Sequence, residues 1–269
     1  MLLQIHWNVD PTIFRLGPLA PRWYGLLFAS GFLIGFYLMR HVFQREGRPE
    51  QDLDFLLLYL LGGTVIGARL GHILFYAPGY YFSNPLEIIA IWEGGLASHG
   101  GLIGVPLAIW LYCRRRDDQP FVWLLDRLAA PVALTGSFIR LGNLFNSEIL
   151  GVPADVPWAI VFERIDQTAR HPVQLYESLS YFLIFGLLWS LYRRWGEDTP
   201  RGLLIGLFFA LVFGVRIVLE LFKVEQAHFA MGLPFGMSMG QLLSVPAVAV
   251  GLWLVWRALQ SSPETTARS

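Results

Sequence analysis

An almost uninterrupted apolar run decides the fold, and it reads Gly202-Leu-Leu-Ile-Gly-Leu-Phe-Phe-Ala-Leu-Val-Phe-Gly-Val-Arg216-Ile-Val-Leu-Glu220-Leu-Phe222. A helix of about 20 apolar residues is long enough to cross a hydrocarbon core about 30 Å thick. The chain of 269 residues is 55% hydrophobic and only 15% charged, whereas a soluble domain carries about 25% charged residues. The sequence therefore predicts an all-α polytopic membrane protein.

Comparable apolar runs recur along the chain and predict about seven transmembrane helices. The spans are expected at residues 23–39, 55–76, 96–113, 121–139, 173–192, 202–222 and 239–257. Glycines spaced four residues apart predict that some of these helices approach each other closely. These glycines are Gly31, Gly35, Gly63, Gly67, Gly71, Gly100 and Gly104.

The chain divides by composition into three parts. Polar residues interrupt residues 1–21, so this part is expected to lie on the membrane as an interfacial segment rather than to act as a signal peptide. Residues 22–257 form the transmembrane domain, with a small extracytoplasmic cap at about 140–172. Residues 258–269 are polar and are expected to be a disordered cytoplasmic tail.

Arginine placement predicts the orientation, because loops rich in Lys and Arg stay on the cytoplasmic side. The loops after the first, third and fifth runs carry most of the loop arginines, so the N-terminus is expected outside and the C-terminus in the cytoplasm. The formal net charge is zero, from 20 basic and 20 acidic residues, and no nucleic-acid partner is expected. The single cysteine, Cys113, excludes an internal disulfide and is interpreted as a buried filler.

Polar side chains recur at a similar depth, toward the outer ends of the predicted spans. They are Tyr24, Arg69, His72, Tyr76, His99, Arg140, Arg216 and Glu220. Ionisable groups near lipid are expensive unless they have partners, so such a cluster indicates a functional site. Structural alternatives remain: Arg216 and Glu220 share a helical face and could pair. Arg69 could bridge Glu87 or Glu93, and the tyrosines could be interfacial residues.

The densest polar stretch is Arg140-Leu-Gly-Asn143-Leu-Phe-Asn146-Ser-Glu148-Ile-Leu-Gly151. Two or three guanidinium groups near the outer leaflet suit a phosphate, which at that depth belongs to a phospholipid headgroup. His99 lies among glycines and could accept a proton near neutral pH. Metal-binding motifs and a nucleophilic serine elbow are absent from the sequence, so neither a metal nor another cofactor is expected.

Six motifs follow one another along the chain. They are Trp23-Tyr24-Gly25, His99-Gly100-Gly101-Leu-Ile-Gly104, Arg140 to Gly151, His171-Pro-Val-Gln174-Leu-Tyr176-Glu177, Arg216-x-x-x-Glu220 and Ser238-Met-Gly240-Gln241. In this order they resemble the motifs of the bacterial prolipoprotein diacylglyceryl transferase family. The resemblance covers about residues 10–257. It implies transfer of the diacylglyceryl group of phosphatidylglycerol to the lipobox cysteine thiol of a prolipoprotein, with release of glycerol phosphate. It also implies a multi-pass protein of the bacterial inner membrane, with the active site toward the periplasm.

The resemblance further implies roles for individual residues. The catalytic candidates are His99 as a base, and Arg140 and Arg216 as stabilisers of the phosphate. The substrate-binding candidates combine residues of these motifs with polar residues that lie at the same depth. They are Tyr24, Arg69, Tyr76, Asn143, Asn146, Glu148 and Glu220. The chain departs from the family pattern at Ile139, Ser147, Val212 and Lys223, where Gly, Gly, Tyr and Arg are usual.

A different class of function remains as an alternative. A transporter or flippase for an anionic lipid or solute could use the same cations. Such a protein needs polar groups along its whole path, often on discontinuous helices. Here the polar residues are confined to the outer half of the spans, which favours the transferase.

Overall fold

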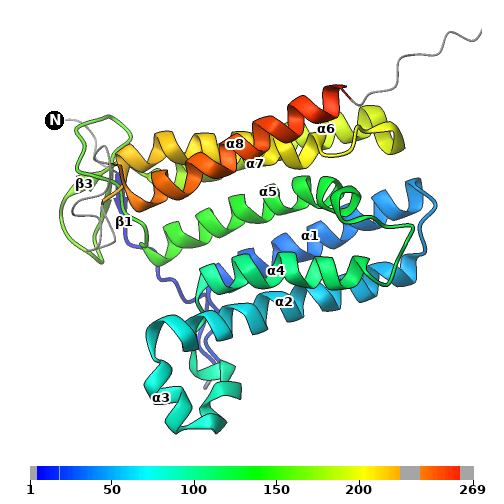
Figure 1. The fold of residues 1–269 in the computed structure, drawn as a ribbon. Helices are drawn as coiled ribbons and strands as arrows, with labels where there is room; N and C mark the ends of the chain where they lie inside the picture. The colour runs from blue at the N-terminus through cyan, green and yellow to red at the C-terminus, as the bar shows by residue number, and fades with distance from the viewer. Residues whose placement is uncertain (1–4, 18, 225–236, 261–269) are drawn as a thin grey trace, which may run out of the picture. The chain divides into compact units, whose positions relative to one another are not determined.

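The structure is a computed structural model, and it describes residues 5–17, 19–224 and 237–260 (Figure 1). Helices make up most of it. The long ones are α1 (Trp23–Arg45), α2 (Glu50–Tyr76), α4 (Ser98–Cys113), α5 (Phe121–Asn146), α6 (Val173–Trp195), α7 (Leu203–Leu219) and α8 (Met239–Gln260). The short elements are β1 (Ile5–Trp7), α3 (Pro78–Ser83), η1 (Pro85–Ile89), η2 (Ile91–Glu93), β2 (Ile160–Phe162), β3 (Ala169–Arg170), η3 (Gly196–Asp198) and η4 (Glu220–Phe222).

Six helices in the described part of the chain are long and apolar enough to cross a membrane. They are α1, α2, α5, α6, α7 continued by η4, and α8. The remaining expected span, at 96–113, corresponds to α4, which is apolar but has only 16 residues. The prediction of an all-α polytopic membrane protein is confirmed. Residues 258–260 of the predicted tail complete α8, whereas residues 261–269 lie outside the described part.

The chain forms two compact units. The larger unit contains residues Met1–Met39 and Leu125–Ser269, and the smaller unit contains residues Arg40–Leu124. Helices α1 and α5 each contribute to both units, because the boundaries fall within them. The two units are described separately below.

In the smaller unit, α2 and α4 lie side by side with their backbones in contact (Figure 1). A Cβ atom at Gly67 would lie 2.6 Å from the carbonyl oxygen of Gly100 and 2.8 Å from the Cα of Gly104. A Cβ atom at Gly71 would lie 2.6 Å from the Cα of Gly100. The close helix approach expected from these glycines is therefore confirmed for this pair.

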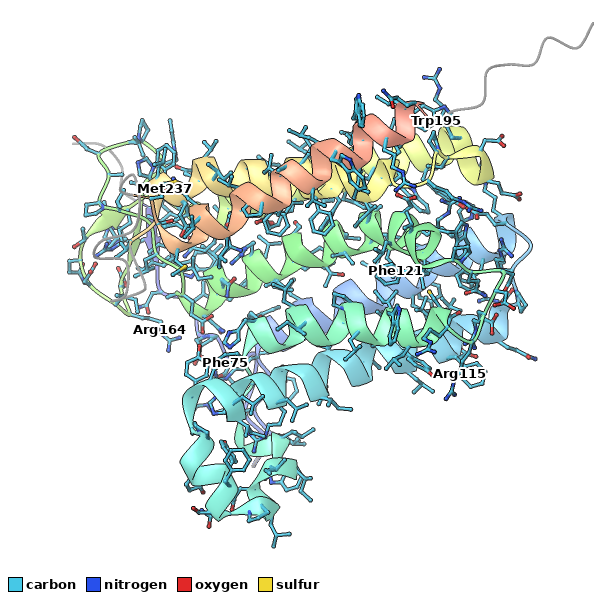
Figure 2. All side chains as sticks on the ribbon, in the orientation of Figure 1. Phe75, Arg115, Phe121, Arg164, Trp195 and Met237 are labelled. Atoms are coloured by element: carbon cyan, nitrogen blue, oxygen red, sulfur yellow. The ribbon has the colours of Figure 1, made fainter. Side chains whose placement is uncertain are left out.

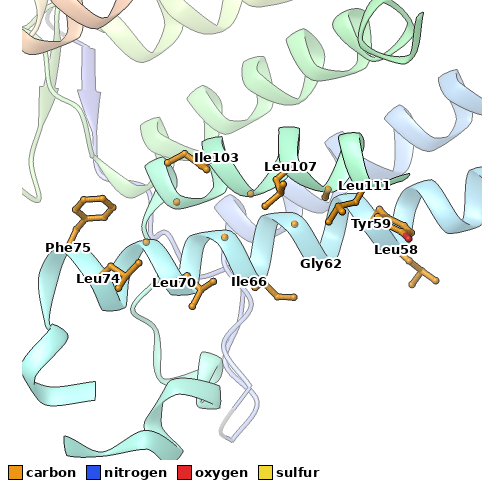
Figure 3. Close-up of a pocket in the computed structure, with 16 residues that line it drawn as sticks. Leu58, Tyr59, Gly62, Ile66, Leu70, Leu74, Phe75, Ile103, Leu107 and Leu111 are labelled. Carbon is orange, nitrogen blue, oxygen red and sulfur yellow. The ribbon is translucent and has the colours of Figure 1, made fainter. Parts of the chain in front are cut away.

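An apolar groove of about 610 Å³ follows the seam between α2 and α4 (Figure 3). Its walls include Leu58, Ile66, Leu70, Ile103 and Leu107. Gly62 also lines the groove, and a Cβ atom at that position would meet nothing within 4 Å. Gly62 and Gly67 thus lie on the same helix but differ in whether a side chain could be accommodated.

This difference predicts that alanine is tolerated at position 62 but not at position 67. Gly67→Ala is expected to lower the free energy of unfolding by about 2 kcal/mol, because the added methyl group overlaps α4. Gly62→Ala is the matched control and is expected to change stability by less than about 0.5 kcal/mol. Thermal unfolding of both variants in detergent measures the difference. Equal destabilisation by the two substitutions would contradict the close packing of α2 against α4 at Gly67.

In the larger unit, α6, α7 and α8 pack together, and a small cap covers one end. The cap contains a three-stranded sheet in the order β1-β2-β3, with β1 parallel to β2 and β2 antiparallel to β3. Ile160 and Phe162 are buried with Leu144, and Trp7 packs against them. Residues 5–7 of the predicted interfacial segment are therefore an edge strand of the cap, and Trp7 packs against its buried core.

Candidate active site

A buried acid in the larger unit holds two cations. Glu177 lies one turn into α6 and its side chain is 0% exposed. One carboxylate oxygen, Oε2, lies 3.1 Å from Nε of Arg140, and the other, Oε1, accepts a hydrogen bond of 2.9 Å from Nζ of Lys223. Lys223 also donates to Oε2 of Glu220 at 3.2 Å. We call Arg140, Glu177, Glu220 and Lys223 the charge cluster.

The end of α5 builds a second network that shares Arg140 with the charge cluster. Spacing by three places Arg140, Asn143 and Asn146 on neighbouring turns of one helical face. Nη1 of Arg140 donates to Oδ1 of Asn143 at 3.4 Å, and Nδ2 of Asn143 donates to Oε2 of Glu148 at 3.1 Å. Nδ2 of Asn146 donates to Oε1 of Glu148 at 3.2 Å. The structure therefore brings these four predicted site residues together, with Arg140 held from two sides.

Backbone strain accompanies this network. Ser147 and Ile149 have φ of 55°, in the left-handed region that L-residues rarely adopt. Ser147 is 5% exposed, and its Oγ is buried without a hydrogen-bond partner among the described residues. The glycine usual in the family would be unstrained there. Strained residues cluster at functional sites, which agrees with a functional role for the end of α5.

The strain makes Ser147→Gly a stabilising substitution. We expect a gain in the free energy of unfolding of about 1 kcal/mol, because glycine relieves the left-handed conformation and removes the unpaired hydroxyl group. Ser190→Gly is the matched control, since Ser190 is an exposed residue inside α6 and glycine there is expected to destabilise by up to about 1 kcal/mol. Thermal unfolding in detergent shows whether each of the two substitutions raises or lowers the stability. A loss of stability in Ser147→Gly would refute the strain argument.

Arg216 differs from the other cations of this region. It lies in the last turn of α7, and its Nε is buried without a hydrogen-bond partner among the described residues. The pairing of Arg216 with Glu220 that the sequence left open is not formed in the described part, where Lys223 is the ion-pair partner of Glu220. Lys223, which stands where arginine is usual in the family, therefore still places a cation between Glu177 and Glu220.

The first turn of α8 packs against the side chain of Glu220. A Cβ atom at Gly240 would overlap the Glu220 carboxylate, so glycine lets this carboxylate lie directly against the α8 backbone. The N–H of Ser238 donates to Oε1 of Gln241 at 3.0 Å, and the N–H of Gln241 donates to Oγ of Ser238 at 3.2 Å. This reciprocal cap starts the helix. It gives a structural reason for the motif Ser238-Met-Gly240-Gln241.

Tyr24 lies at the start of α1, against the end of α5. A Cβ atom at Gly142 would lie 2.7 Å from Cδ2 of Tyr24, so the ring packs directly on the α5 backbone. Its neighbour Trp23 stacks on Phe145 with ring centroids 5.2 Å apart. Tyr24 is also close enough to Glu148 to interact with its charge. The predicted substrate-binding residue Tyr24 therefore belongs to the same local assembly.

Residues of the cap support the start of α6. The Tyr176 hydroxyl group accepts a hydrogen bond of 2.7 Å from Nε1 of Trp158 and lies 3.1 Å from Nδ1 of His171. Nε2 of Gln174, which is fully buried, donates to the backbone oxygen of Glu148 at 2.7 Å. The motif that begins at His171 thus attaches α6 to the end of α5 and so positions Glu177.

Asp166 belongs to a partly buried ion pair in the cap and has a shifted pKa. Nη2 of Arg170 donates to Oδ2 of Asp166 at 2.6 Å, and the backbone N–H of Thr168 donates to Oδ1 at 2.9 Å. These hydrogen bonds, the one from Arg170 first, hold the pKa of Asp166 below its ordinary value. The cap therefore keeps this carboxylate charged at neutral pH.

Three of the predicted site residues lie in the smaller unit. His99 is the second residue of α4, and its ring centroid lies 5.2 Å from that of Phe75 and 5.6 Å from that of Tyr76. Figure 2 labels Phe75 near the end of α2. Tyr76 stacks on His72 with centroids 5.4 Å apart. Arg69 is 5% exposed and directs its guanidinium group to backbone oxygens rather than toward an open site.

Two residues of the charge cluster were not among the predicted site residues. Glu177 belongs to the motif that begins at His171, and Lys223 is one of the departures from the family pattern. A carboxylate in an apolar run is expensive without a partner, and this cost could have pointed to Glu177. Its two cations are 37 and 46 residues away along the chain, at Arg140 and Lys223, so spacing alone could not identify them. Among the described residues, His, Cys, Asp and Glu side chains form no group of three or more that could hold a metal ion.

Comparisons with known proteins place this chain among enzymes of one kind. The family model described as prolipoprotein diacylglyceryl transferase matches residues 11–257. A protein of Tolumonas auensis named phosphatidylglycerol–prolipoprotein diacylglyceryl transferase is 55% identical over 252 residues, which cover 94% of this chain and 96% of that protein. A protein of the same name from Chloroherpeton thalassium is 51% identical over 258 residues, covering 96% of both chains. Another from Porphyromonas gingivalis is 42% identical over 272 residues, covering 96% of this chain and 95% of that protein.

Proposed function

The chain belongs to the prolipoprotein diacylglyceryl transferase family, and from this premise we infer the chemistry of its site. The enzyme transfers the diacylglyceryl group of phosphatidylglycerol to the cysteine thiol of a prolipoprotein lipobox, the first step of lipoprotein maturation. The sulfur atom attacks the glyceryl carbon that carries the phosphate. A carbon–sulfur bond forms as the carbon–oxygen bond breaks, and the electron pair leaves with glycerol phosphate.

This reaction needs a proton acceptor and a partner for developing negative charge. An ordinary thiol has a pKa of about 8.5, so a base or a positive field assists its attack. We assign His99 as the base that takes the thiol proton. The leaving phosphate gains a negative charge as the bond breaks, and cationic donors held in advance stabilise such a charge. We assign Arg216 and Arg140 to this task.

One observation carries the assignment of the phosphate-binding residues. In the charge cluster, Arg140 and Lys223 share the buried carboxylate of Glu177. Arg216 instead has a buried Nε without a partner among the described residues. A buried unpaired guanidinium N–H is costly, and a bound phosphate would satisfy it. Arg216 is therefore proposed as the direct phosphate ligand, while Arg140 is oriented by Glu177 and Asn143.

The direct test uses purified protein in detergent with phosphatidylglycerol and a lipobox peptide. Mass spectrometry of the peptide is expected to show the added diacylglyceryl group on its cysteine. His99→Gln and Arg140→Ala are expected to abolish this mass gain while retaining the thermal unfolding transition of the folded protein. A wild-type protein that binds phosphatidylglycerol without changing the peptide would instead favour the transporter alternative.

We further propose that the protein lies in the bacterial inner membrane with the cap toward the periplasm. The distribution of loop arginines supports this orientation. Asp155 is exposed in the cap and suits a cysteine label in a Cys113→Ala background. Asp155→Cys in intact spheroplasts is expected to react with a membrane-impermeant maleimide. Labelling only after the membrane is permeabilised would reverse the proposed orientation.

A further inference from the structure

We propose that Arg69 is a positioning residue for His99, rather than a ligand of the lipid headgroup. The proposal rests on the function assigned to His99 above and concerns how its place is determined. Arg69 lies on α2, and its guanidinium group reaches the chain that leads from η1 to α4. By holding this chain, Arg69 determines where α4 begins, and His99 is the second residue of α4.

Among the described residues, the hydrogen bonds of the Arg69 guanidinium group all reach one short segment of backbone. Its Nε donates to the carbonyl oxygen of Ile88 at 2.9 Å. Its Nη1 donates to the carbonyl oxygens of Gly94 at 2.7 Å and Gly95 at 3.2 Å. Its Nη2 donates to the carbonyl oxygen of Glu87. Four carbonyl groups between residues 87 and 95 therefore accept hydrogen bonds from one side chain.

These contacts leave Arg69 little capacity for a phosphate. A guanidinium group has five N–H donors, and a bidentate phosphate contact needs two of them side by side. All three nitrogens of Arg69 already donate to carbonyl oxygens, and the group stacks 4.8 Å from the ring centroid of Tyr81. The residue is only 5% exposed. A headgroup could bind there only by releasing carbonyl groups that now accept a hydrogen bond from Arg69.

A tight turn at Gly94 and Gly95 connects the segment that Arg69 binds to the start of α4, where His99 lies. Gly94 and Gly95 have φ of 94° and 71°, conformations that suit glycine. A Cβ atom at Gly95 would lie 2.7 Å from Nη1 of Arg69, so the turn fits directly against the guanidinium group. Two residues later, the N–H of Ala97 donates to the carbonyl oxygen of Ala68 at 2.9 Å.

The start of α4 is thereby tied to two successive residues of α2. The tie at Ala68 is a backbone hydrogen bond, and the tie at Arg69 is a set of side-chain hydrogen bonds. The His99 ring then rests against Phe75 and Tyr76 further along the same helix. A misplacement of about 1 Å in a reacting group can lower a rate about 100-fold. Loss of the Arg69 contacts is therefore expected to affect turnover more than substrate binding.

The kinetic test separates the two roles of Arg69. Arg69→Gln is expected to lower kcat about 100-fold while the Kd for phosphatidylglycerol in detergent stays within about twofold of wild type. Arg69→Lys is expected to behave like Arg69→Gln, because an ammonium group cannot reach the same spread of carbonyl oxygens. A rise in Kd of tenfold or more with kcat unchanged would overturn the proposal and restore the headgroup role.

A second variant disturbs the same turn without removing the arginine. Gly95→Ala places a methyl group against Nη1 of Arg69 and is expected to lower kcat in the same way. The double variant Arg69→Gln/Gly95→Ala is expected to be no slower than the slower single variant, since both act on one contact. Gly79→Ala is the matched control, because a Cβ atom there meets nothing within 4 Å, and its activity is expected to equal that of wild type. Unchanged kcat in Gly95→Ala would contradict the proposal even if Arg69→Gln fails to fold.

The failure of this inference is distinguishable from failure of the proposed function. If wild-type protein adds no lipid to the peptide, the proposed function fails. If wild type is active and His99→Gln keeps its activity, the assigned role of His99 fails, and the positioning proposal fails with it. If His99→Gln is inactive while Arg69→Gln and Gly95→Ala turn over normally, only the positioning proposal fails.

Discussion

Arg216→Ala is expected to abolish measurable diacylglyceryl transfer, with kcat falling at least about 100-fold. The reason is that the substitution removes a cation whose buried Nε has no partner among the described residues and is proposed to meet the phosphate. Among the described residues no ion pair holds Arg216, so its removal strands no carboxylate there, and the free energy of unfolding is expected to change little or to rise. The mass of the lipobox peptide and thermal unfolding in detergent measure the two effects separately.

Two further variants make this result specific. Arg216→Lys keeps the charge but loses the planar fork, so transfer is expected to be partly retained. Arg201→Ala removes an exposed arginine that precedes α7, at the opposite end of that helix from Arg216, and is expected to leave transfer unchanged. Full activity in Arg216→Ala would remove the basis for the proposed phosphate site.

Glu177→Gln is expected to reduce both folding stability and activity. The substitution keeps the shape of the side chain but leaves Arg140 and Lys223 without the carboxylate that lies between them. Breaking a buried ion pair by changing one partner typically costs about 3–5 kcal/mol, because the other charge stays buried and unpaired. Arg140 also loses one of its two anchors, so kcat is expected to fall at least about tenfold. Thermal unfolding and the peptide assay measure the two losses.

The ion-pair origin of this effect is tested by a double-mutant cycle. In Glu177→Gln/Lys223→Met the ammonium group that loses the Glu177 carboxylate is removed as well, so the combined loss of stability is expected to be smaller than the sum of the single losses by about 0.5–3 kcal/mol. Glu163→Gln is the matched control, because Glu163 pairs with His6 and its side chain is 32% exposed. Its effect is expected to stay below about 1 kcal/mol. Strictly additive losses at positions 177 and 223 would show that the pair does not act as a unit.

The sequence alone was sufficient for the membrane spans. Hydrophobic transfer depends on the composition of about 20 consecutive residues, so each apolar run carries its own structural information. The expected span at 202–222 corresponds to α7 and η4, and the one at 121–139 corresponds to the first part of α5. α5 continues to Asn146, because its last turns bury Leu144 in the cap rather than in lipid. Local composition could not reveal that contact.

Short-range spacing also predicted part of the candidate site. Arg140, Asn143 and Asn146 follow one another at intervals of three, and the helical repeat places them together. The structure adds that Glu148 accepts from both amides across a strained turn at Ser147. This strain is visible in the sequence only as a serine where glycine is usual.

Only the tertiary structure decided how the charges pair. The sequence allowed Arg216 to pair with Glu220, and it allowed Arg69 to bind a headgroup. In the structure Glu220 pairs with Lys223, and Arg69 donates to carbonyl oxygens 18 to 26 residues away. The physical reason is that a charge near lipid takes whichever partner lies within about 3 Å, and that distance depends on how helices pack. Apolar runs and helical spacing are local properties, whereas the choice of partner belongs to the folded chain.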